Sequence, residues 1–313
     1  MYVFLKKIVI MKFTYEINNR STDFWRGDCV KTIKEIEEAL RLIDEPTPWI
    51  MELKSDQRAG VKKALARWQR GYEKRQLEIE KHLLKIQFDA SFRRFDAAQV
   101  AGVDEAGRGP LAGPVVTAAV ILPAETPELI GLDDSKTISK ETREELADKI
   151  RSVAIAYSVH IQSARKIDEL NIYAATRDSM ERAVKALSVA PDFVIVDAMA
   201  LNIDYPTASI VKADAQSLAV AAASIIAKTT RDSLMDKLHE EFPSYNFTKN
   251  AGYGTAEHVA ALHSVGPCEH HRESFEPVRS ILEKRGIEPV RSILEERGIE
   301  PVKSMLEERR MDL

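Results

Sequence analysis

Cysteine is scarce in this chain of 313 residues, because only Cys29 and Cys268 are present and they lie far apart. Two such cysteines provide no disulfide framework, so a reducing compartment is expected. The grouping of Cys268 with His270 and His271 could suggest zinc, but no second cluster completes a set of four ligands. The sequence therefore does not favour a disulfide-rich or zinc-binding protein.

Long apolar runs are also lacking, since no segment approaches the ~20 apolar residues that span a bilayer. The first eleven residues are apolar, but Lys6 and Lys7 interrupt them and no small-residue cleavage site follows. This start is a poor match to a signal peptide, and translation could begin at Met1 or at Met11. We expect no membrane segment and predict a cytoplasmic protein that is a monomer.

Charge of one sign is not in excess over the whole chain, whose formal net charge is −4. Residues 51–97, however, hold twelve Lys and Arg against seven Asp and Glu. Nucleic-acid binding depends on where charge lies, so the total excludes no such partner. Within this stretch, residues 56–88 have apolar side chains near helical spacing. They form either an amphipathic helix packed on another element or a basic arm that contacts a phosphate backbone.

After Gln99 the pattern changes to short apolar runs, rich in β-branched residues and bounded by turn residues, which are typical of strands. The predicted strands are 100–103, 114–122, 155–162, 193–197 and 209–212. Helices are predicted over 31–43, 56–88, 166–187 and 215–239. Small residues at Ala219, Ala221, Ala222 and Ala223 would let the last helix lie close to a sheet. The order of elements predicts an α/β fold, a mixed sheet flanked by helices with an N-terminal helical region.

Three regions are expected along the chain. They are an N-terminal helical and partly basic region at 1–97, a catalytic domain at 98–276, and a tail at 277–313. The tail repeats a unit of twelve residues that begins with proline and, in its first two copies, ends near a glycine. Each unit is too short to bury a core of its own, so we predict a partly helical tail without catalytic residues.

Four carboxylates stand at the ends of predicted strands or at the start of a helix: Asp104, Glu105, Asp197 and Asp214. Carboxylates at a sheet end are costly unless they are paired, and several together suit two hard divalent cations, Mg²⁺ or Mn²⁺. Two such ions about 3.5–4 Å apart can activate water and stabilise the leaving oxygen of a phosphodiester. Alone, Asp214 could equally be a helix N-cap. Neighbouring strand residues face opposite sides, so we expect the first strand to end at or just before Glu105.

Residues 101–115 (AGVDEAGRGPLAGPV) resemble the first motif of the ribonuclease HII family. The family's other motifs follow in order at 133–136, 196–198, 212–214, 222–232, 252–258 and 271–277. Residues 50–97 are similar to the N-terminal helical extension of some bacterial members. Type 3 enzymes have Gly-Thr-Gly where this chain has Gly-Arg-Gly at 107–109, which favours type 2. The family usually has glycine at Ala198 and Ala213, so the local backbone geometry there is in doubt.

The resemblance implies a ribonuclease H-like fold in which Asp104, Glu105, Asp197 and Asp214 bind Mn²⁺ or Mg²⁺ and carry catalysis. It implies an endonuclease that cuts the RNA strand of RNA/DNA hybrids and cuts 5′ of ribonucleotides embedded in duplex DNA, leaving a 3′-hydroxyl and a 5′-phosphate. A catalytically silent hybrid-binding protein of the same fold is the alternative, and the loss of one carboxylate would have supported it. A nuclease acting on other DNA structures is disfavoured by the two glycine-rich loops.

Substrate recognition must sense the 2′-hydroxyl that marks a ribose. The resemblance gives this role to the main chain of Gly107, Arg108 and Gly109 together with Tyr253. Without the other motifs, Gly-Tyr-Gly at 252–254 would be an ordinary turn with a surface aromatic residue. Further candidate substrate contacts are Ser135, Lys136, Ser224, Lys228 and Arg231. The last three lie at i, i+4 and i+7 on one helix face, which is either a solvated stripe or, as we favour, a phosphate-facing one.

Overall fold

The computed structural model describes residues 31–132 and 138–287 and forms two compact units, divided between Lys81 and His82. The division falls inside helix α4 (Ala59–Ala90), so this helix contributes to both units. It lies earlier than the expected boundary at residue 97, because His82, Lys85 and Asp89 are buried in the second unit. The end of α4 is thus part of the second unit's core.

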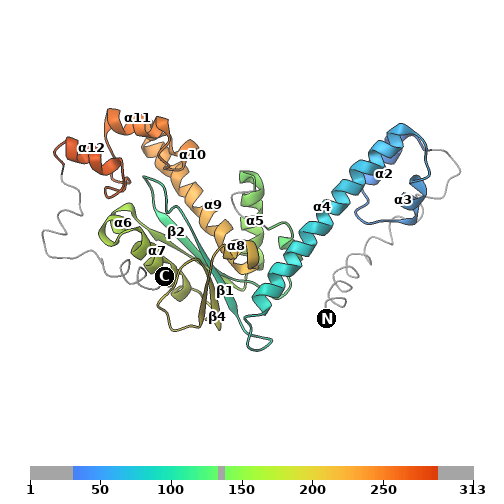
Figure 1. Cartoon of the computed structure of the whole chain (residues 1–313), viewed down its shortest axis with the longest axis horizontal. Coiled ribbons are helices and arrows are strands. Elements are labelled where there is room, and N and C mark those ends of the chain that lie inside the picture. The colour runs from blue at the N-terminus through green and yellow to red at the C-terminus, as the bar shows by residue number, and fades with distance from the viewer. Residues whose placement is uncertain (1–30, 133–137, 288–313) are drawn as a thin grey trace, which may run out of the picture. The chain divides into compact units, whose positions relative to one another are not determined.

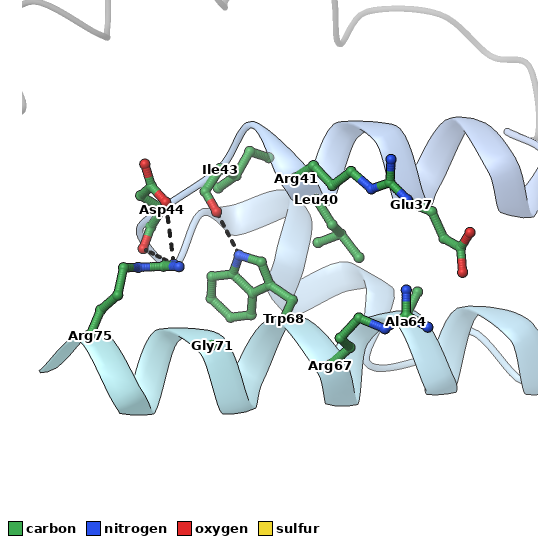
Figure 2. A pocket seen from close by; sticks show the side chains of 10 residues that line it. All are labelled: Glu37, Leu40, Arg41, Ile43, Asp44, Ala64, Arg67, Trp68, Gly71 and Arg75. Atoms are coloured by element: carbon green, nitrogen blue, oxygen red, sulfur yellow. Dashed lines mark hydrogen bonds and ion pairs between the residues drawn. The ribbon is translucent and has the colours of Figure 1, made fainter. Parts of the chain in front are cut away.

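The first unit consists of α2 (Ile33–Arg41), α3 (Pro48–Leu53) and the first part of α4. Helix α2 begins with a capping box, in which Thr32 accepts a hydrogen bond from the backbone of Glu35 and the Glu35 carboxylate accepts one from the backbone of Thr32. Trp68 is buried against α2, and its indole donates to the carbonyl of Ile43 at 2.6 Å (Figure 2). The predicted N-terminal helices are confirmed to within a few residues.

The second unit is built on a five-stranded sheet with the order β3-β2-β1-β4-β5. The strands are β1 (Val100–Ala106), β2 (Val115–Ile121), β3 (Ala156–Gln162), β4 (Phe193–Asp197) and β5 (Thr207–Ile210). Strands β1, β2 and β3 are antiparallel neighbours, whereas β4 is parallel to both β1 and β5. The mixed sheet predicted from the sequence is therefore confirmed.

Helices cover both faces of this sheet (Figure 1). On one face α9 (Leu218–Glu241) and α5 (Lys140–Val153) pack against β1 and β2, and on the other face α7 (Ile172–Lys185) packs, preceded by α6 (Ala164–Leu170). A Cβ atom added to Gly102 of β1 would lie 2.1 Å from the backbone carbon of Ala219. The backbone of α9 therefore lies directly on the sheet, as its small residues predicted.

The structure corrects three local expectations. Strand β1 continues through Ala106, because Glu105 and Ala106 still pair with β2, so the expected end at Glu105 was wrong. The helix predicted from residue 215 is two helices, α8 (Ala213–Gln216) and α9, and Ser217 caps α9 by accepting from the amide of Val220 at 3.1 Å. Asp214 is therefore not the cap. The helix predicted over 166–187 is interrupted at Asn171, whose φ is 69°.

The remaining elements surround the C-terminal part of α9. They are η1 (Pro127–Leu129), η2 (Pro243–Tyr245), α10 (Phe247–Asn250), α11 (Ala256–Val265) and α12 (Val278–Lys284). Helix α12 is the first copy of the repeat and ends before Gly286, which has a positive φ, as predicted for that copy. The later copies lie outside the described residues. Within residues 31–132 and 138–287, no helix is long and apolar enough to span a membrane.

Candidate active site

The predicted carboxylates meet at one edge of the sheet because β1 and β4 run in parallel. Val103 lies opposite Val196, so the next residues of the two strands, Asp104 and Asp197, emerge side by side. The Asp197 carboxylate accepts a hydrogen bond from the amide of Ala213 at 2.8 Å. This bond brings α8, and with it Asp214, to the same edge.

Asp104 is the buried member of this carboxylate edge, which consists of Asp104, Glu105, Asp197 and Asp214. Its burial, followed by the charge of Glu105, raises the pKa of Asp104 well above its usual range, and Asp197 adds to the effect. Hydrogen bonds from Ser224 and from the Glu105 amide act in the opposite direction. An ionised Asp104 is thus poorly stabilised by the protein alone, and a bound cation would relieve the repulsion.

Oxygen atoms alone are offered at the carboxylate edge, which is the donor set that Mg²⁺ and Mn²⁺ prefer. In the part of the chain that the structure describes, no three His, Cys, Asp or Glu side chains are already arranged as a metal site. The oxygen donors and the repulsion that raises the pKa of Asp104 nevertheless fit a hard divalent cation.

Lys85, near the end of α4, holds the backbone beside the carboxylate edge. It is 4% exposed, and its amine donates to the backbone carbonyl of Asp214 at 3.0 Å and to that of Leu132 at 3.3 Å. Asp89, one helical turn later, accepts from the amide of Ala219 at the start of α9. The sequence interpretation missed both residues. Their partners lie 129 and 130 residues further along the chain, and nothing local in a charged helix shows which of its side chains will be buried.

The loop after β1 contains the predicted Gly-Arg-Gly residues. Gly107 has a φ of 97°, and a Cβ atom there would lie 2.0 Å from Nε of Arg231, so only glycine is accommodated. Arg272 donates to the carbonyls of Arg108 at 2.8 Å and of Gly107 at 2.5 Å. The Arg108 side chain is partly exposed and lies 3.5 Å from the Glu105 carboxylate. The loop backbone therefore packs against Arg231 and is hydrogen-bonded by Arg272.

Tyr253 lies beside this loop. A Cβ atom on Gly109 would be 3.5 Å from Cε1 of Tyr253, and the Tyr253 side chain is 50% exposed. The carbonyl of Gly252 accepts from the amide of Leu111 at 2.8 Å, which joins the two loops through their backbones. The structure thus brings together the two loops that the sequence predicted for ribose recognition, and we call residues 107–113 and 250–254 the ribose platform.

The helix-face residues do not form one exposed stripe. Arg231 is 1% exposed and donates to the carbonyls of Pro114, Ala251 and Ala112, so it joins the two loops and is not on the surface. Ser224 is buried against Asp104. Lys228 is partly exposed and pairs with Asp232 at 2.6 Å, so it alone of the three remains accessible. Ser135 and Lys136 lie outside the described residues.

Arg272 and Asp168 support the platform and were not expected from the sequence. Arg272 is fully buried, and burial, followed by the charge of Arg231, lowers its pKa to about 9, so it stays charged at neutral pH. Asp168 on α6 accepts from the amides of Glu273 and Ser274, both at 2.9 Å, and fixes the segment that carries Arg272. The motif at 271–277 was noted, but only the fold shows that its arginine points inward.

Comparison with known proteins agrees with this arrangement. The family model for ribonuclease HII matches residues 101–278, and that for the ribonuclease HII N-terminal domain matches residues 32–93. The chain belongs to the ribonuclease HII family. It is 47% identical to ribonuclease HII of Bacillus licheniformis over 250 residues, covering 80% of this chain and 98% of that protein. For ribonuclease HII of Bacillus cereus the identity is 44% over 254 residues, covering 81% and 98%.

Among solved structures, the ribonuclease H2 of Pyrococcus horikoshii OT3 is similar, with a TM-score of 0.53 and 29% identity. The similarity covers 59% of this chain and 98% of that one, so it concerns the second unit's fold. Membership of the ribonuclease HII family makes the chain a type 2 ribonuclease H, which is a nuclease and a hydrolase. Its ribonuclease H-like sheet and its N-terminal helices are both as predicted.

Proposed function

We propose that the chain is an endonuclease that hydrolyses the RNA strand of RNA/DNA hybrids and cuts on the 5′ side of ribonucleotides embedded in duplex DNA. The products would be a 3′-hydroxyl and a 5′-phosphate. The observation that carries the proposal is the juxtaposition of the carboxylate edge with the ribose platform: Glu105 and Gly107 are two residues apart on one strand and its loop. A phosphodiester at the edge would thus have its ribose at the platform.

Asp104, Glu105, Asp197 and Asp214 would hold the divalent cations. Two bound Mg²⁺ or Mn²⁺ ions would activate the attacking water and stabilise the leaving 3′-oxygen. The residues around them keep the carboxylates in place: Ser224 orients Asp104, the Ala213 amide orients Asp197, and Lys85 holds the backbone at Asp214. Lys228 is partly exposed and would contact a neighbouring phosphate by exchanging its ion pair with Asp232.

Ribose recognition would combine two features of the platform. The Gly-Arg-Gly backbone at 107–109 can approach a 2′-hydroxyl closely, because its glycines have no side chains in the way. The half-exposed ring of Tyr253 can stack on the sugar or base of the same nucleotide. Deoxyribose would lose the first interaction. Because the stacked ring would place the sugar where the 2′-hydroxyl contact can form, losing either interaction would weaken the preference for ribose.

The N-terminal unit offers cations for the phosphate backbone. Arg41 and Arg67 are exposed and line a hollow of about 200 Å³ whose floor includes Leu40 and Trp68 (Figure 2). Arg75, on the same rim, lies 3.4 Å from Asp44, so that cation is already partly neutralised. We propose that Arg41 and Arg67 contact duplex phosphates and contribute affinity without sequence preference.

The experiment that tests this function compares a DNA duplex carrying one ribonucleotide with an all-DNA duplex of the same sequence. Each is incubated with the full chain in chelator, in Mg²⁺ and in Mn²⁺. We expect cleavage of the first duplex alone, 5′ of the ribonucleotide, and only with metal. Full activity in chelator would contradict the metal assignment, and cleavage of both duplexes would contradict the ribose assignment.

A further inference from the structure

Two histidines are buried behind the ribose platform, away from the carboxylate edge. His258 on α11 is fully buried, His271 is 2% exposed, and their Nε2 atoms are 2.9 Å apart. The rings of Tyr245 and Phe247 enclose the pair. A histidine pair in such an apolar enclosure is costly unless every ring nitrogen has a matching partner.

The partners allow one arrangement of protons in which both rings are neutral. The carbonyl of Tyr253 can only accept, so Nδ1 of His258, at 2.9 Å, must donate to it. Nε2 of a neutral His258 is then an acceptor, and Nε2 of His271 must donate to it. Nδ1 of His271 is left to accept, and the amide of Cys268 donates to it at 3.0 Å. This order follows from the hydrogen-bond network, and it makes both rings neutral.

The groups around the pair agree with neutral rings. Burial, followed by the charge of His258, lowers the pKa of His271 to about 4, and burial lowers that of His258. The titratable groups that face the pair are Tyr245, Cys268 and His270, and none of them is an anion at neutral pH. A proton added to Nε2 of His258 would bring two N–H groups face to face between the rings, and one added to Nδ1 of His271 would oppose the Cys268 amide and leave only the carbonyl of Cys268, at 3.3 Å, as its acceptor.

We infer that His258 and His271 are positioning residues for ribonucleotide recognition, forming a hydrogen-bonded chain from the Cys268 amide to the Tyr253 carbonyl that holds Tyr253 beside Gly109. The inference rests on the proposed role of Tyr253. Arg272 holds the Gly-Arg-Gly side of the platform and Arg231 joins both loops, whereas the histidine chain contacts the tyrosine side alone. The position of the stacking ring relative to the 2′-hydroxyl reader would thus depend on the histidine chain as well as on the two arginines.

The test uses two substitutions at His271 that keep opposite halves of its contacts. His271→Gln places an amide N–H near the position of Nε2 and keeps the donor to His258. His271→Asn places an oxygen near the position of Nδ1, keeps the acceptor for Cys268, and loses that donor. In single-turnover cleavage of a duplex with one ribonucleotide, we expect His271→Asn to be about three- to tenfold slower, the ratio that one neutral hydrogen bond is worth. His271→Gln should retain most of the rate.

A double-mutant cycle with Tyr253→Ala separates positioning from a merely structural effect. If His271 acts through Tyr253, then His271→Asn should slow the parent but have no further effect in the Tyr253→Ala background. Multiplicative losses in the double variant, or equal losses for Asn and Gln, would overturn the inference. If Tyr253→Ala itself cleaves at the parental rate, the proposed role of Tyr253 fails, which is a different result from a normal His271→Asn.

If the His271 variants fold poorly, substitutions of His258, at the other end of the hydrogen-bonded histidine chain, test the same inference. His258→Asn keeps a donor toward the Tyr253 carbonyl, and His258→Leu removes it. We expect the asparagine variant to cleave faster than the leucine variant by about three- to tenfold. Equal rates would overturn the inference. Mn²⁺ titration of each variant should give the parental affinity, since the carboxylate edge is not touched.

Discussion

The carboxylate edge and the ribose platform lie next to each other but are stabilised in opposite ways. At the edge, like charges are gathered, and the pKa of Asp104 is raised because the protein offers it little compensation. At the platform, the buried cations Arg231 and Arg272 donate to backbone carbonyls of the two loops. The charges at the edge are left largely uncompensated by the protein, whereas the platform's backbone is already hydrogen-bonded within it.

This difference teaches how one short motif can serve two purposes. Glu105 belongs to the edge and Gly107 to the platform, and only Ala106 separates them. The edge needs side chains at the ends of parallel strands, which local sequence specifies. The platform needs distant side chains, from α9 and from the segment at 271–275, to hold a glycine-rich backbone in place. Substitutions at the two regions should therefore have separable effects.

The largest expected effect comes from neutralising the edge. Asp197→Asn or Asp104→Asn should remove most of the turnover, because a cation ligand is lost. Without metal, Asp104→Asn should also raise the melting temperature, because it removes a buried charge that two carboxylates repel. Single-turnover cleavage and thermal unfolding in chelator measure the two effects. Near-normal turnover of Asp197→Asn would contradict its place at the edge.

Removing the stacking ring tests the platform. Tyr253→Ala should slow cleavage of a single-ribonucleotide duplex roughly ten- to hundredfold, since a stacking contact is worth about 1–3 kcal/mol. Tyr253→Phe separates the ring from its hydroxyl, and a mild loss would mean that stacking dominates. Tyr173→Ala is the matched control, because Tyr173 is a 41% exposed tyrosine on α7. If Tyr253→Ala and Tyr173→Ala behave alike, the 252–254 loop is only a turn.

Two truncations ask whether the N-terminal unit belongs to either region. Removing residues 1–81 should weaken duplex binding and flatten its salt dependence, by roughly one unit of log–log slope per lost phosphate contact, with the cleavage position unchanged. Removing residues 1–97 should in addition reduce stability and turnover, because Lys85 and Asp89 are lost. Arg67→Ala in the full chain should reduce the salt slope in the same direction but by a smaller amount. An unchanged salt slope would reduce the first unit to structural support.

Acid should weaken the tyrosine side of the platform through His271. Its pKa is about 4 when folded and near 6.5 when unfolded, so the unfolded chain binds the extra proton and stability falls as pH drops below 6.5. By pH 5 this amounts to about 2 kcal/mol. Asp89, whose pKa burial raises to about 6, changes in the opposite direction, so the parent must be compared with a variant. His271→Gln should lose about 2 kcal/mol less between pH 7 and pH 5 in denaturant unfolding, and parallel curves would contradict this.

The smallest expected effect concerns the backbone beside Asp197. Ala198 has a φ of 46°, a left-handed conformation that costs a residue with a Cβ atom roughly 1–2 kcal/mol. Ala198→Gly should raise the free energy of unfolding by up to about 1 kcal/mol, since glycine's greater freedom in the unfolded chain offsets part of the gain. Ala208→Gly on β5 is the control and should destabilise. If Ala198→Gly lowered the free energy of unfolding, the left-handed conformation at residue 198 would not be a source of strain.

The sequence predicted the edge better than the platform, and the reason is physical. Short, continuous apolar runs predict β1 and β4, and parallel pairing of these strands then brings Asp104 and Asp197 together. The departure at Ala198 also proved to mark an unusual backbone conformation. In contrast, Arg231 has the helical spacing of a surface stripe, and only the packing of two loops against α9 buries it.

Supports that join distant segments were not predictable from local patterns. Lys85 lies in a helix full of lysine and arginine, and nothing nearby distinguishes it from its exposed neighbours. The break at Asn171 has a local cause that was overlooked, since its side-chain oxygen caps α7 by accepting from the amide of Ala174 at 3.0 Å. The extension of β1 to Ala106 depends on its pairing with β2. Side chains whose roles depend on long-range contacts are thus the ones for which the fold is needed.

The central claim is that the edge binds metal and the platform reads ribose independently. The most direct measurement combines Mn²⁺ titration with the binding preference for a single-ribonucleotide duplex over an all-DNA duplex, for Asp197→Asn and Tyr253→Ala. We expect Asp197→Asn to lose metal affinity and keep the preference for the single-ribonucleotide duplex. Tyr253→Ala should keep metal affinity and lose that preference. If each variant lost both its Mn²⁺ affinity and its preference for the single-ribonucleotide duplex, the edge and the platform would not act independently, which would contradict the central claim.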